Sequence, residues 1–266
     1  MHSPFVVDLH ACVRPSDPFI DLDALVPEHA NASNPTAPLL VLENVVKRFP
    51  QPGGGTLTVL DIPDFRLDRG EQVALVGTSG GGKTTLLHLI AGLLAADEGS
   101  IRFDNVELTK LSEQGRDRMR AASIGYVFQT FNLLPAFTAI ENVRLGMSFA
   151  RRRGDIARAS DLLERVGLKD RMHYRPSQLS VGQQQRVAIA RSLAGRPKLL
   201  LADEPTANVD PVSSETVLEL IRASCREENI GLLCVTHDHG VAAQFDRLER
   251  LEDINRAFKD TAVAAS

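Results

Sequence analysis

The sequence predicts an α/β protein built on a parallel sheet, with a β-rich region before the sheet and a helical region inserted into it. The apolar run Glu71–Gly77 leads through a glycine-rich loop into the helical pattern Thr84–Leu94, which is the local unit of a parallel sheet. A second apolar run, Lys198–Glu204, returns later as another buried strand. Between these runs, Asn105–Arg175 carries mostly helical spacing, as in Asp155–Leu168.

The region before the sheet predicts two strands and a turn. Leu39–Phe49 and Thr56–Leu67 have strand character, and Pro50–Gly55 has the composition of a turn. Residues before Leu39 mix prolines, acids and small polar residues without periodicity, so we expect a poorly ordered extension. The expected parts are the extension, a main folded domain, its helical subdomain and a C-terminal tail, at residues 1–37, 38–255, about 105–185 and 256–266.

Composition and charge narrow the functional classes. With 43% hydrophobic residues and a formal net charge of -4, the chain has a globular composition and lacks the basic field that nucleic-acid binders use. Three irregularly spaced cysteines, Cys12, Cys225 and Cys234, favour reduced structural thiols over disulfides or a zinc site. The most apolar stretch, Leu86–Ala96, is too short to span a bilayer, and the N-terminus lacks the pattern of a secretory signal. We therefore expect a cytoplasmic protein with no nucleic-acid partner.

A glycine-rich loop is the first motif with chemical meaning. Residues 77–85 read G-T-S-G-G-G-K-T-T and match G-x-x-x-x-G-K-[ST] between an expected strand and an expected helix. Glycines let successive backbone N–H groups converge on phosphate oxygens, and the helix adds its positive end. We expect Lys83 to meet the β- and γ-phosphates and the Thr84 hydroxyl to ligate Mg²⁺. The residues predicted to bind ATP here are Gly77, Thr78, Ser79, Gly80, Gly81, Gly82, Lys83, Thr84 and Thr85.

Two carboxylates, Asp203 and Glu204, end the second apolar strand. Ligands of open α/β sheets gather at the carboxyl ends of the strands, so Asp203 is expected to hold the same Mg²⁺ as Thr84, directly or through water. Glu204 points differently from its neighbour, and this position suits a general base that polarises the attacking water. Standing alone, the pair would equally fit a solvated acidic strand end.

The segment Gln178–Leu193, which reads Q-L-S-V-G-Q-Q-Q-R-V-A-I-A-R-S-L, lies between the two motifs. A serine and a glycine at a helix N-terminus offer hydroxyl and N–H donors to a phosphate, although a plain N-capped helix fits the same residues. The segment resembles the signature of ABC ATPases, in which L-S-G-G-Q precedes a helix. Ser180, Gly182 and Gln183 match that pattern, and Val181 stands where glycine is usual.

This resemblance gives roles to four more residues. Gln129, which ends I-G-Y-V-F-Q, falls at the family's Q-loop position, and Asp210 in A-N-V-D resembles its D-loop. His237 in C-V-T-H-D resembles the switch histidine that contacts the γ-phosphate, and Phe49 matches the aromatic that stacks on adenine. Taken singly, such a histidine is often structural and such an aromatic fits plain core. The resemblance implies catalytic roles for Glu204, His237, Gln129 and Lys83, and metal contacts for Thr84, Gln129 and Asp203.

The resemblance covers about residues 39–253. It implies a P-loop NTPase (RecA-like) core with an N-terminal antiparallel β region and an inserted α-helical signature subdomain, using ATP and Mg²⁺. Because one chain carries one nucleotide site and no internal repeat, a second copy must complete the family's head-to-tail ATP-sandwich homodimer. The family also implies integral membrane permease subunits, met through the surface at residues 130–137, although these apolar residues fit subdomain core equally well.

Within the family, the sequence of residues 124–143 and 179–210 looks most like that of the lipoprotein-releasing, macrolide-export and cell-division ATPases. That subgroup implies export or periplasmic work from the cytoplasmic face of the inner membrane. An ABC-type ATPase of DNA repair is disfavoured because too few residues separate Lys83 from Ser180 for a long coiled coil. A non-catalytic regulatory or structural nucleotide-binding module is the alternative, but Lys83, Glu204 and His237 are all intact.

Overall fold

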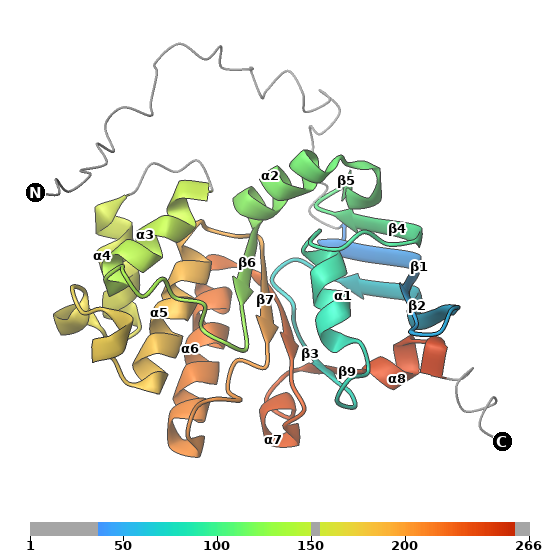
Figure 1. Ribbon diagram of the computed structural model, residues 1–266. Helices are drawn as coiled ribbons and strands as arrows, with labels where there is room; N and C mark the ends of the chain where they lie inside the picture. The colour runs from blue at the N-terminus through green and yellow to red at the C-terminus, as the bar shows by residue number, and fades with distance from the viewer. Residues whose placement is uncertain (1–36, 150–154, 259–266) are drawn as a thin grey trace, which may run out of the picture. The chain divides into compact units, whose positions relative to one another are not determined.

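Two sheets form the framework of the protein, which a computed structural model describes over residues 37–149 and 155–258 (Figure 1). Residues 1–36, which hold most of the expected extension and Cys12, and residues 259–266 of the expected tail lie outside the described residues. One sheet is parallel, in the order β6-β7-β8-β3-β9, and the other is antiparallel, in the order β2-β1-β4-β5. The parallel strands are β3 (Gln72–Val76), β6 (Ile124–Val127), β7 (Leu199–Asp203), β8 (Gly231–Val235) and β9 (Arg247–Arg250).

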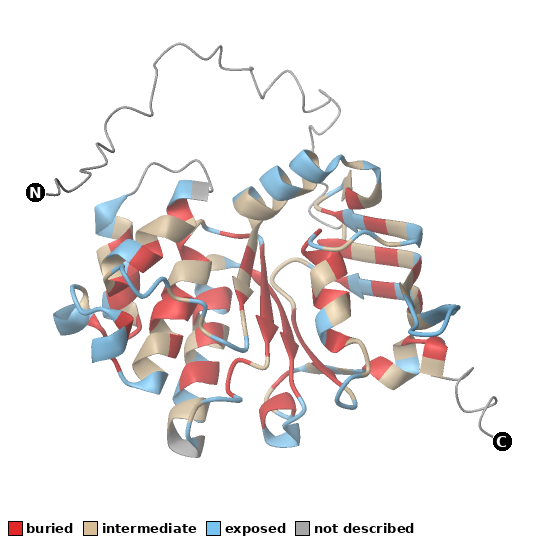
Figure 2. Cartoon of the chain, in the orientation of Figure 1, coloured by how far each residue is buried: buried red, intermediate tan, exposed pale blue. Residues whose placement is uncertain are grey.

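The central strands of the parallel sheet, β7, β8 and β3, are buried along their whole length (Figure 2). Burial on both faces explains why these strands read as continuous apolar runs instead of alternating patterns. Successive side chains point to opposite faces of the sheet. Leu75 and Leu201 therefore join one hydrophobic core, whereas Ala74 and Leu200 join another. The parallel sheet is thus the wall between two cores.

The first core lies under the antiparallel sheet. Its strands are β1 (Leu40–Pro50), β2 (Thr56–Leu67), β4 (Glu98–Phe103) and β5 (Val106–Glu107). The pairing of β1 with β2 confirms the two strands and the turn expected at the start of the fold. Helix α1 (Lys83–Ile90) packs into the same core through Leu86, Leu87 and Ile90. It ends before the predicted Leu94 because the N–H groups of Leu93 and Leu94 both bond to the His88 carbonyl.

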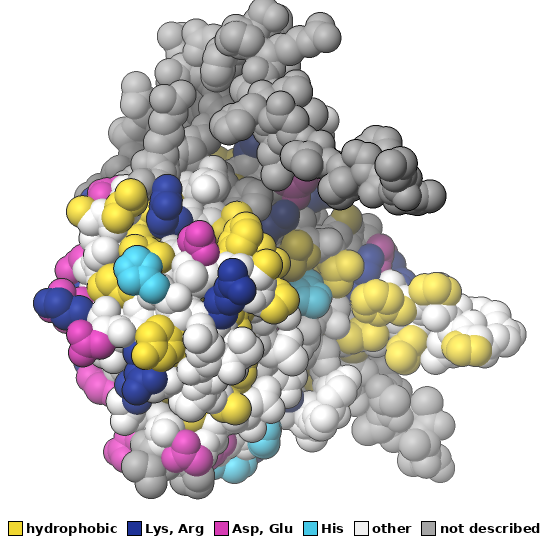
Figure 3. Space-filling view, turned by 60° about the vertical axis from the view of Figure 1, so that its left-hand side comes forward, with side chains coloured by type: hydrophobic (Ala, Val, Ile, Leu, Met, Phe, Trp, Pro, Cys, Tyr) yellow, Lys and Arg dark blue, Asp and Glu magenta, His cyan; other side chains and the backbone are white. Residues whose placement is uncertain are grey.

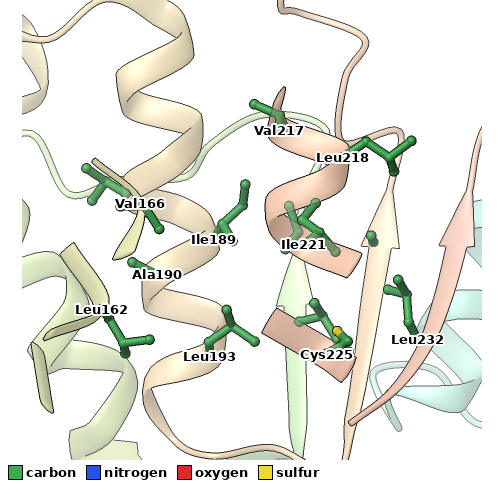
Figure 4. Packing of buried hydrophobic residues seen from close by; sticks show 14 of the residues in the cluster. Leu162, Val166, Ile189, Ala190, Leu193, Val217, Leu218, Ile221, Cys225 and Leu232 are labelled. Carbon is green, nitrogen blue, oxygen red and sulfur yellow. The ribbon is translucent and has the colours of Figure 1, made fainter. Parts of the chain in front are cut away.

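Four helices share the core on the other face of the parallel sheet, two of them packed against the sheet and two packed against those helices (Figure 4). They are α3 (Ala139–Phe149), α4 (Ile156–Arg165), α5 (Val181–Ala194) and α6 (Pro211–Glu228). Leu162 of α4, Ile189 of α5 and Ile221 of α6 are fully or almost fully buried in this second core. Side-chain caps begin three of these helices: Asp155 caps α4, Ser180 caps α5 and Asp210 caps α6. The core and the caps together set where each helix starts and which face it buries.

The expectation of helix from Asn105 to Arg175 is wrong at one place that matters for the site. After α2 (Glu113–Ser123), the chain enters β6, which pairs in parallel with β7. A four-residue strand between helices is too short for its period to stand out against helical spacing. Gly125 of β6 allows α5 to pack closely, because a Cβ there would lie 2.4 Å from the Ser192 carbonyl oxygen.

The remaining described helices are short. α7 (His239–Ala242) follows β8, and α8 (Leu251–Ile254) follows β9. No helix among residues 37–149 and 155–258 is long and apolar enough to cross a membrane. Cys225 of α6 and Cys234 of β8 are buried free thiols, and burial raises the pKa of Cys225 to about 12. These two cysteines therefore pack as small apolar residues, as the sequence predicts.

Candidate active site

A tight loop at residues 77–82 joins the buried end of β3 to the start of α1. Gly82 takes the left-handed conformation, with φ 99°, and a Cβ there would lie 3.0 Å from Leu60 Cδ2. The position therefore accepts glycine only. Lys83 is 8% exposed, and its ammonium donates to the carbonyl oxygens of Gly77 and Thr78 at 2.8 and 2.9 Å. The loop thus holds a buried positive charge over its own carbonyls at a helix N-terminus.

Asp203 and Glu204 occupy the carboxyl end of β7, next to this loop. Burial raises the pKa of Asp203 above its usual value, against the opposing effects of a hydrogen bond from Thr84 and the positive charge of Lys83. Glu204 has a left-handed backbone, with φ 49°, and its N–H donates to the Val235 carbonyl at 2.9 Å. This sharp turn separates the directions of the two carboxylates, as expected for groups with different tasks.

His237 follows the neighbouring strand β8 and contacts Glu204 directly. Its Nδ1 lies 2.8 Å from Glu204 Oε1, and its backbone N–H donates to Glu204 Oε2 at 3.4 Å. The His237 side chain is 68% exposed, whereas that of Glu204 is 12% exposed. The histidine can therefore orient the shielded carboxylate while its own ring faces solvent.

The loop, the carboxylates and the histidine line one recess of about 320 Å³. The recess brings together backbone N–H groups, the Lys83 ammonium, a hydroxyl, an amide and two carboxylates, groups that can serve phosphoryl transfer to water. Gln129 reaches the recess because β6 is a strand of the parallel sheet, so its carboxyl end meets that of β7. The lining residues are Ser79, Gly80, Gly82, Lys83, Thr84, Thr85, Gln129, Asp203, Glu204 and His237.

The signature residues lie outside this recess, at the N-terminus of α5. Ser180 and Gln183 bond to each other's backbone: the Ser180 hydroxyl accepts from the Gln183 N–H at 3.3 Å, and Gln183 Oε1 accepts from the Ser180 N–H at 3.0 Å. In this structure the segment therefore behaves as an N-capped helix. Gly182 lies beside the start of α6, since a Cβ there would be 3.8 Å from Ser213, whose N–H bonds to Asp210. Signature and D-loop candidates are thus neighbours.

Phe49 is placed in β1, opposite Leu57 of β2, and is partly exposed. The Lys47 ammonium lies 5.5 Å from the centroid of its ring. Val59, which follows Leu57 along β2, lies next to the phosphate loop, because a Cβ on Gly82 would be 3.0 Å from Val59 Cγ1. The hairpin of β1 and β2 therefore lies against the phosphate loop, although Phe49 itself does not line the recess.

Two residues near the loop and the carboxylates were given no role by sequence inspection, although Tyr126 lies within the segment that ends at Gln129. Tyr126 of β6 stacks on Phe128 with 4.1 Å between ring centroids, and burial next to the Asp203 carboxylate raises the pKa of its hydroxyl. Glu252 of α8 accepts a hydrogen bond from the Thr78 N–H at 2.7 Å. Only the strand order of the folded sheet brings β6 and α8 to this place.

Comparisons with known proteins agree with this geometry. The family model described as ABC transporter matches residues 60–207. The lipoprotein-releasing system ATP-binding protein LolD 2 of Caulobacter vibrioides is 44% identical over 223 residues, covering 83% of this chain and 96% of that protein. The protein LolD of Hyphomonas neptunium is 45% identical over 219 residues, covering 81% of this chain and 95% of that protein.

Solved structures give the same family. The dimeric post-hydrolysis state of the ATP-binding cassette MJ0796, bound to ADP and Pi, matches with a TM-score of 0.73 and 36% identity, covering 80% of this chain and 94% of that one. A dimeric structure of MJ0796, described as a bacterial ABC transporter cassette, matches with a TM-score of 0.72. The predicted P-loop core with its antiparallel β region and helical subdomain is therefore confirmed. The chain belongs to the ABC transporter ATP-binding family and is an ATP-hydrolysing nucleotide-binding subunit.

Proposed function

We propose that this chain works as a homodimer on the cytoplasmic face of the inner membrane, where its ATP cycle drives permease subunits that release lipoproteins. The observation that carries the proposal is the extent of the match to two proteins named for lipoprotein release. This chain covers 96% and 95% of their lengths at 44% and 45% identity. A match over whole proteins supports a shared task better than a match confined to the nucleotide site.

A head-to-tail dimer accounts for the position of the signature. The recess supplies donors and carboxylates on one side of the bound phosphates, while Ser180 and Gly182 lie outside it. In a two-fold dimer, the signature of each chain would close over the recess of the other. The dimeric MJ0796 structures support this arrangement, as does Val181, an apolar side chain 49% exposed at the start of α5. Each ATP would then join two subunits until hydrolysis removes the γ-phosphate contacts.

Within the recess, we assign one task to each group. Lys83 and the N–H groups of the loop bind the β- and γ-phosphates. Glu204 accepts a proton from the attacking water, and His237 holds that carboxylate in place and faces the γ-phosphate. Outside the recess, on the neighbouring hairpin of β1 and β2, Phe49 is assigned to stack on adenine. The 2.8 Å contact between His237 and Glu204 supports this division, because a base needs a fixed direction toward its water.

The recess also fits Mg²⁺. The Thr84 hydroxyl, the Asp203 carboxylate and the Gln129 side chain offer the oxygen ligands that this ion prefers. Asp203 is largely buried and accepts a hydrogen bond from Thr84, so the two candidate ligands lie next to each other. When bound, Mg²⁺ would neutralise charge on the phosphate oxygens.

A groove on the helical side of the molecule is the proposed permease contact. It has a volume of about 580 Å³ and lies between α2, β6, α3 and α5, with Leu93 and Phe128 in its lining. Arg191 of α5 ties the chain after Gln129 to this groove by donating to the carbonyl oxygens of Phe131 and Asn132. Apolar and charged side chains are mixed on the helical side in Figure 3. Such a surface suits a partner helix with an apolar face.

The proposal is tested by co-expressing the chain with lipoprotein-releasing permease subunits of its own organism and measuring the amount of the chain in washed membranes. Leu93→Asp places a charge in the groove at a side chain that is 44% exposed. We expect this variant to lose membrane association while its basal ATP turnover stays within about twofold of wild type. Leu248→Asp, at a side chain 48% exposed on β9, is the matched control and should remain on the membrane. Equal retention of both variants would refute the groove as the docking site.

A further inference from the structure

The phosphate loop is braced from outside by a carboxylate of the C-terminal region. Strand β9 pairs in parallel with β3 so that Arg250 lies opposite Val76, the last residue before the loop. The chain that follows β9 therefore runs beside the first residues of the loop. There, Glu252 Oε1 accepts a hydrogen bond from the Thr78 N–H at 2.7 Å.

This hydrogen bond acts on the peptide group that holds the loop lysine. The N–H of Thr78 and the C=O of Gly77 belong to one planar peptide, so fixing the direction of one fixes the other. The Gly77 carbonyl accepts from Lys83 Nζ at 2.8 Å, and the Thr78 carbonyl accepts from the same ammonium at 2.9 Å. Glu252 and Lys83 thus hold opposite sides of one peptide group.

The segment that carries Glu252 is firmly seated. Asn255 is 1% exposed and bridges to β2, donating to the Val59 carbonyl at 2.9 Å and accepting from the Asp61 N–H at 2.7 Å. Phe258 lies against the far end of the loop, where a Cβ on Gly81 would be 3.0 Å from its ring. The segment after β9 therefore contacts the loop at both ends and is fixed to β2 between them.

We infer that Glu252 is a positioning residue for nucleotide binding: its carboxylate fixes the Gly77–Thr78 peptide, and through it the Lys83 ammonium, in the orientation that receives the phosphates. The inference rests on the nucleotide site described above and adds a residue to it. Glu252 is anionic at neutral pH, because the donated Thr78 N–H holds its pKa below the usual value despite partial burial, which raises it. A negative charge near phosphates would by itself weaken ATP binding. Removing the charge alone should therefore strengthen ATP binding, whereas losing the hydrogen bond should weaken it.

Two substitutions separate the hydrogen bond from the charge. Glu252→Gln keeps an acceptor oxygen at the same reach and removes the charge, whereas Glu252→Asp keeps the charge and withdraws the acceptor by one methylene group. We expect Glu252→Asp to raise the dissociation constant for a fluorescent ATP analogue roughly 10-fold, the usual loss for a hydrogen bond to a charged group. Glu252→Gln should bind within about threefold of wild type. The KM for ATP should follow the dissociation constant, with kcat nearly unchanged.

Asp253→Asn is the matched control. It removes the same charge from an exposed side chain that lies one residue after Glu252. It should bind the analogue as wild type does. Wild-type affinity in Glu252→Asp would overturn the inference, and so would tighter binding in Glu252→Gln together with unchanged binding in Glu252→Asp. Equal weakening in both variants would show that an acceptor oxygen at residue 252 does not preserve binding, and would overturn the inference as well. Failure of the wild-type chain to bind the analogue would instead contradict the nucleotide site itself.

Discussion

His237 Nδ1 lies 2.8 Å from Glu204 Oε1, although the two residues follow different strands of the parallel sheet. The pairing of β7 with β8, in which Asp203 lies opposite Val235, brings the two strand ends together. The backbone N–H of His237 also points at the same carboxylate. The direction of Glu204 therefore depends on the neighbouring strand as well as on its own.

Replacing His237 should lower the turnover of ATP but leave ATP binding nearly unchanged. In His237→Ala, Glu204 keeps its charge but loses the ring that holds it, and misplacement of a catalytic group commonly lowers rates about 10²-fold. We expect that loss in kcat, with ATP affinity within a few-fold of wild type, measured by phosphate release and by titration with a fluorescent ATP analogue. Turnover at the wild-type rate would show that the contact is structural only.

Glu204→Gln removes the proposed base and keeps its size. Turnover should fall by roughly 10²–10⁴-fold, the usual contribution of a general base, while ATP binding persists. Because the γ-phosphate then stays in place, a dimer should accumulate with ATP in size-exclusion chromatography with light scattering. Glu113→Gln, at an exposed position of α2, is the control and should remain active. Near-normal hydrolysis by Glu204→Gln would contradict the role of Glu204.

Lys83→Met should weaken nucleotide binding itself. The substitution keeps much of the buried stem but removes the ammonium that contacts the Gly77 and Thr78 carbonyls. We expect the dissociation constant for ATP to rise about 10- to 100-fold, as for the loss of a charged hydrogen-bond donor. Thermal unfolding without nucleotide is measured alongside to separate binding from stability. Unchanged affinity would contradict the phosphate cradle.

The ion pairs of Glu228 join α4 to α6, and they predict that the free energy of unfolding depends on pH. Glu228 accepts from Arg158 and Arg165, each at 2.7 Å, and these partners lower its pKa although partial burial raises it. A lowered pKa stabilises the fold above the ordinary glutamate value of about 4.5 and ceases to do so as pH falls through the folded-state pKa.

Glu228→Gln should therefore lower the midpoint of thermal unfolding at pH 7 by roughly 2–8 °C. The difference from wild type should shrink as pH falls below about 4.5, because the wild-type carboxyl is then protonated as well. Differential scanning calorimetry across this range measures both effects. Glu215→Gln, at an exposed position of α6, should leave the midpoint unchanged. A pH-independent difference between wild type and Glu228→Gln would argue against this ion pair as the source.

The phosphate loop and the carboxylates could be predicted from sequence because each follows a strand with a strong local signal, whereas His237 was assigned by resemblance. Residues that depend on strand order could not. Gln129 was assigned only by resemblance, since β6 was hidden within helical spacing. Glu252 and its donor Thr78 are distant along the chain and meet because β9 lies next to β3. The ion pairs of Glu228 likewise join helices that pack only in the folded protein.

The left-handed backbone at Glu204 sets activity against stability. A residue with a Cβ costs of order 1–2 kcal/mol in this conformation, and glycine would relieve most of that cost. Glycine would therefore relieve strain at the position where the proposed base has to be glutamate. Selection for thermal stability alone would favour glycine at residue 204 and so give an inactive protein. Screens for thermostable variants of this ATPase should therefore keep Glu204 unchanged.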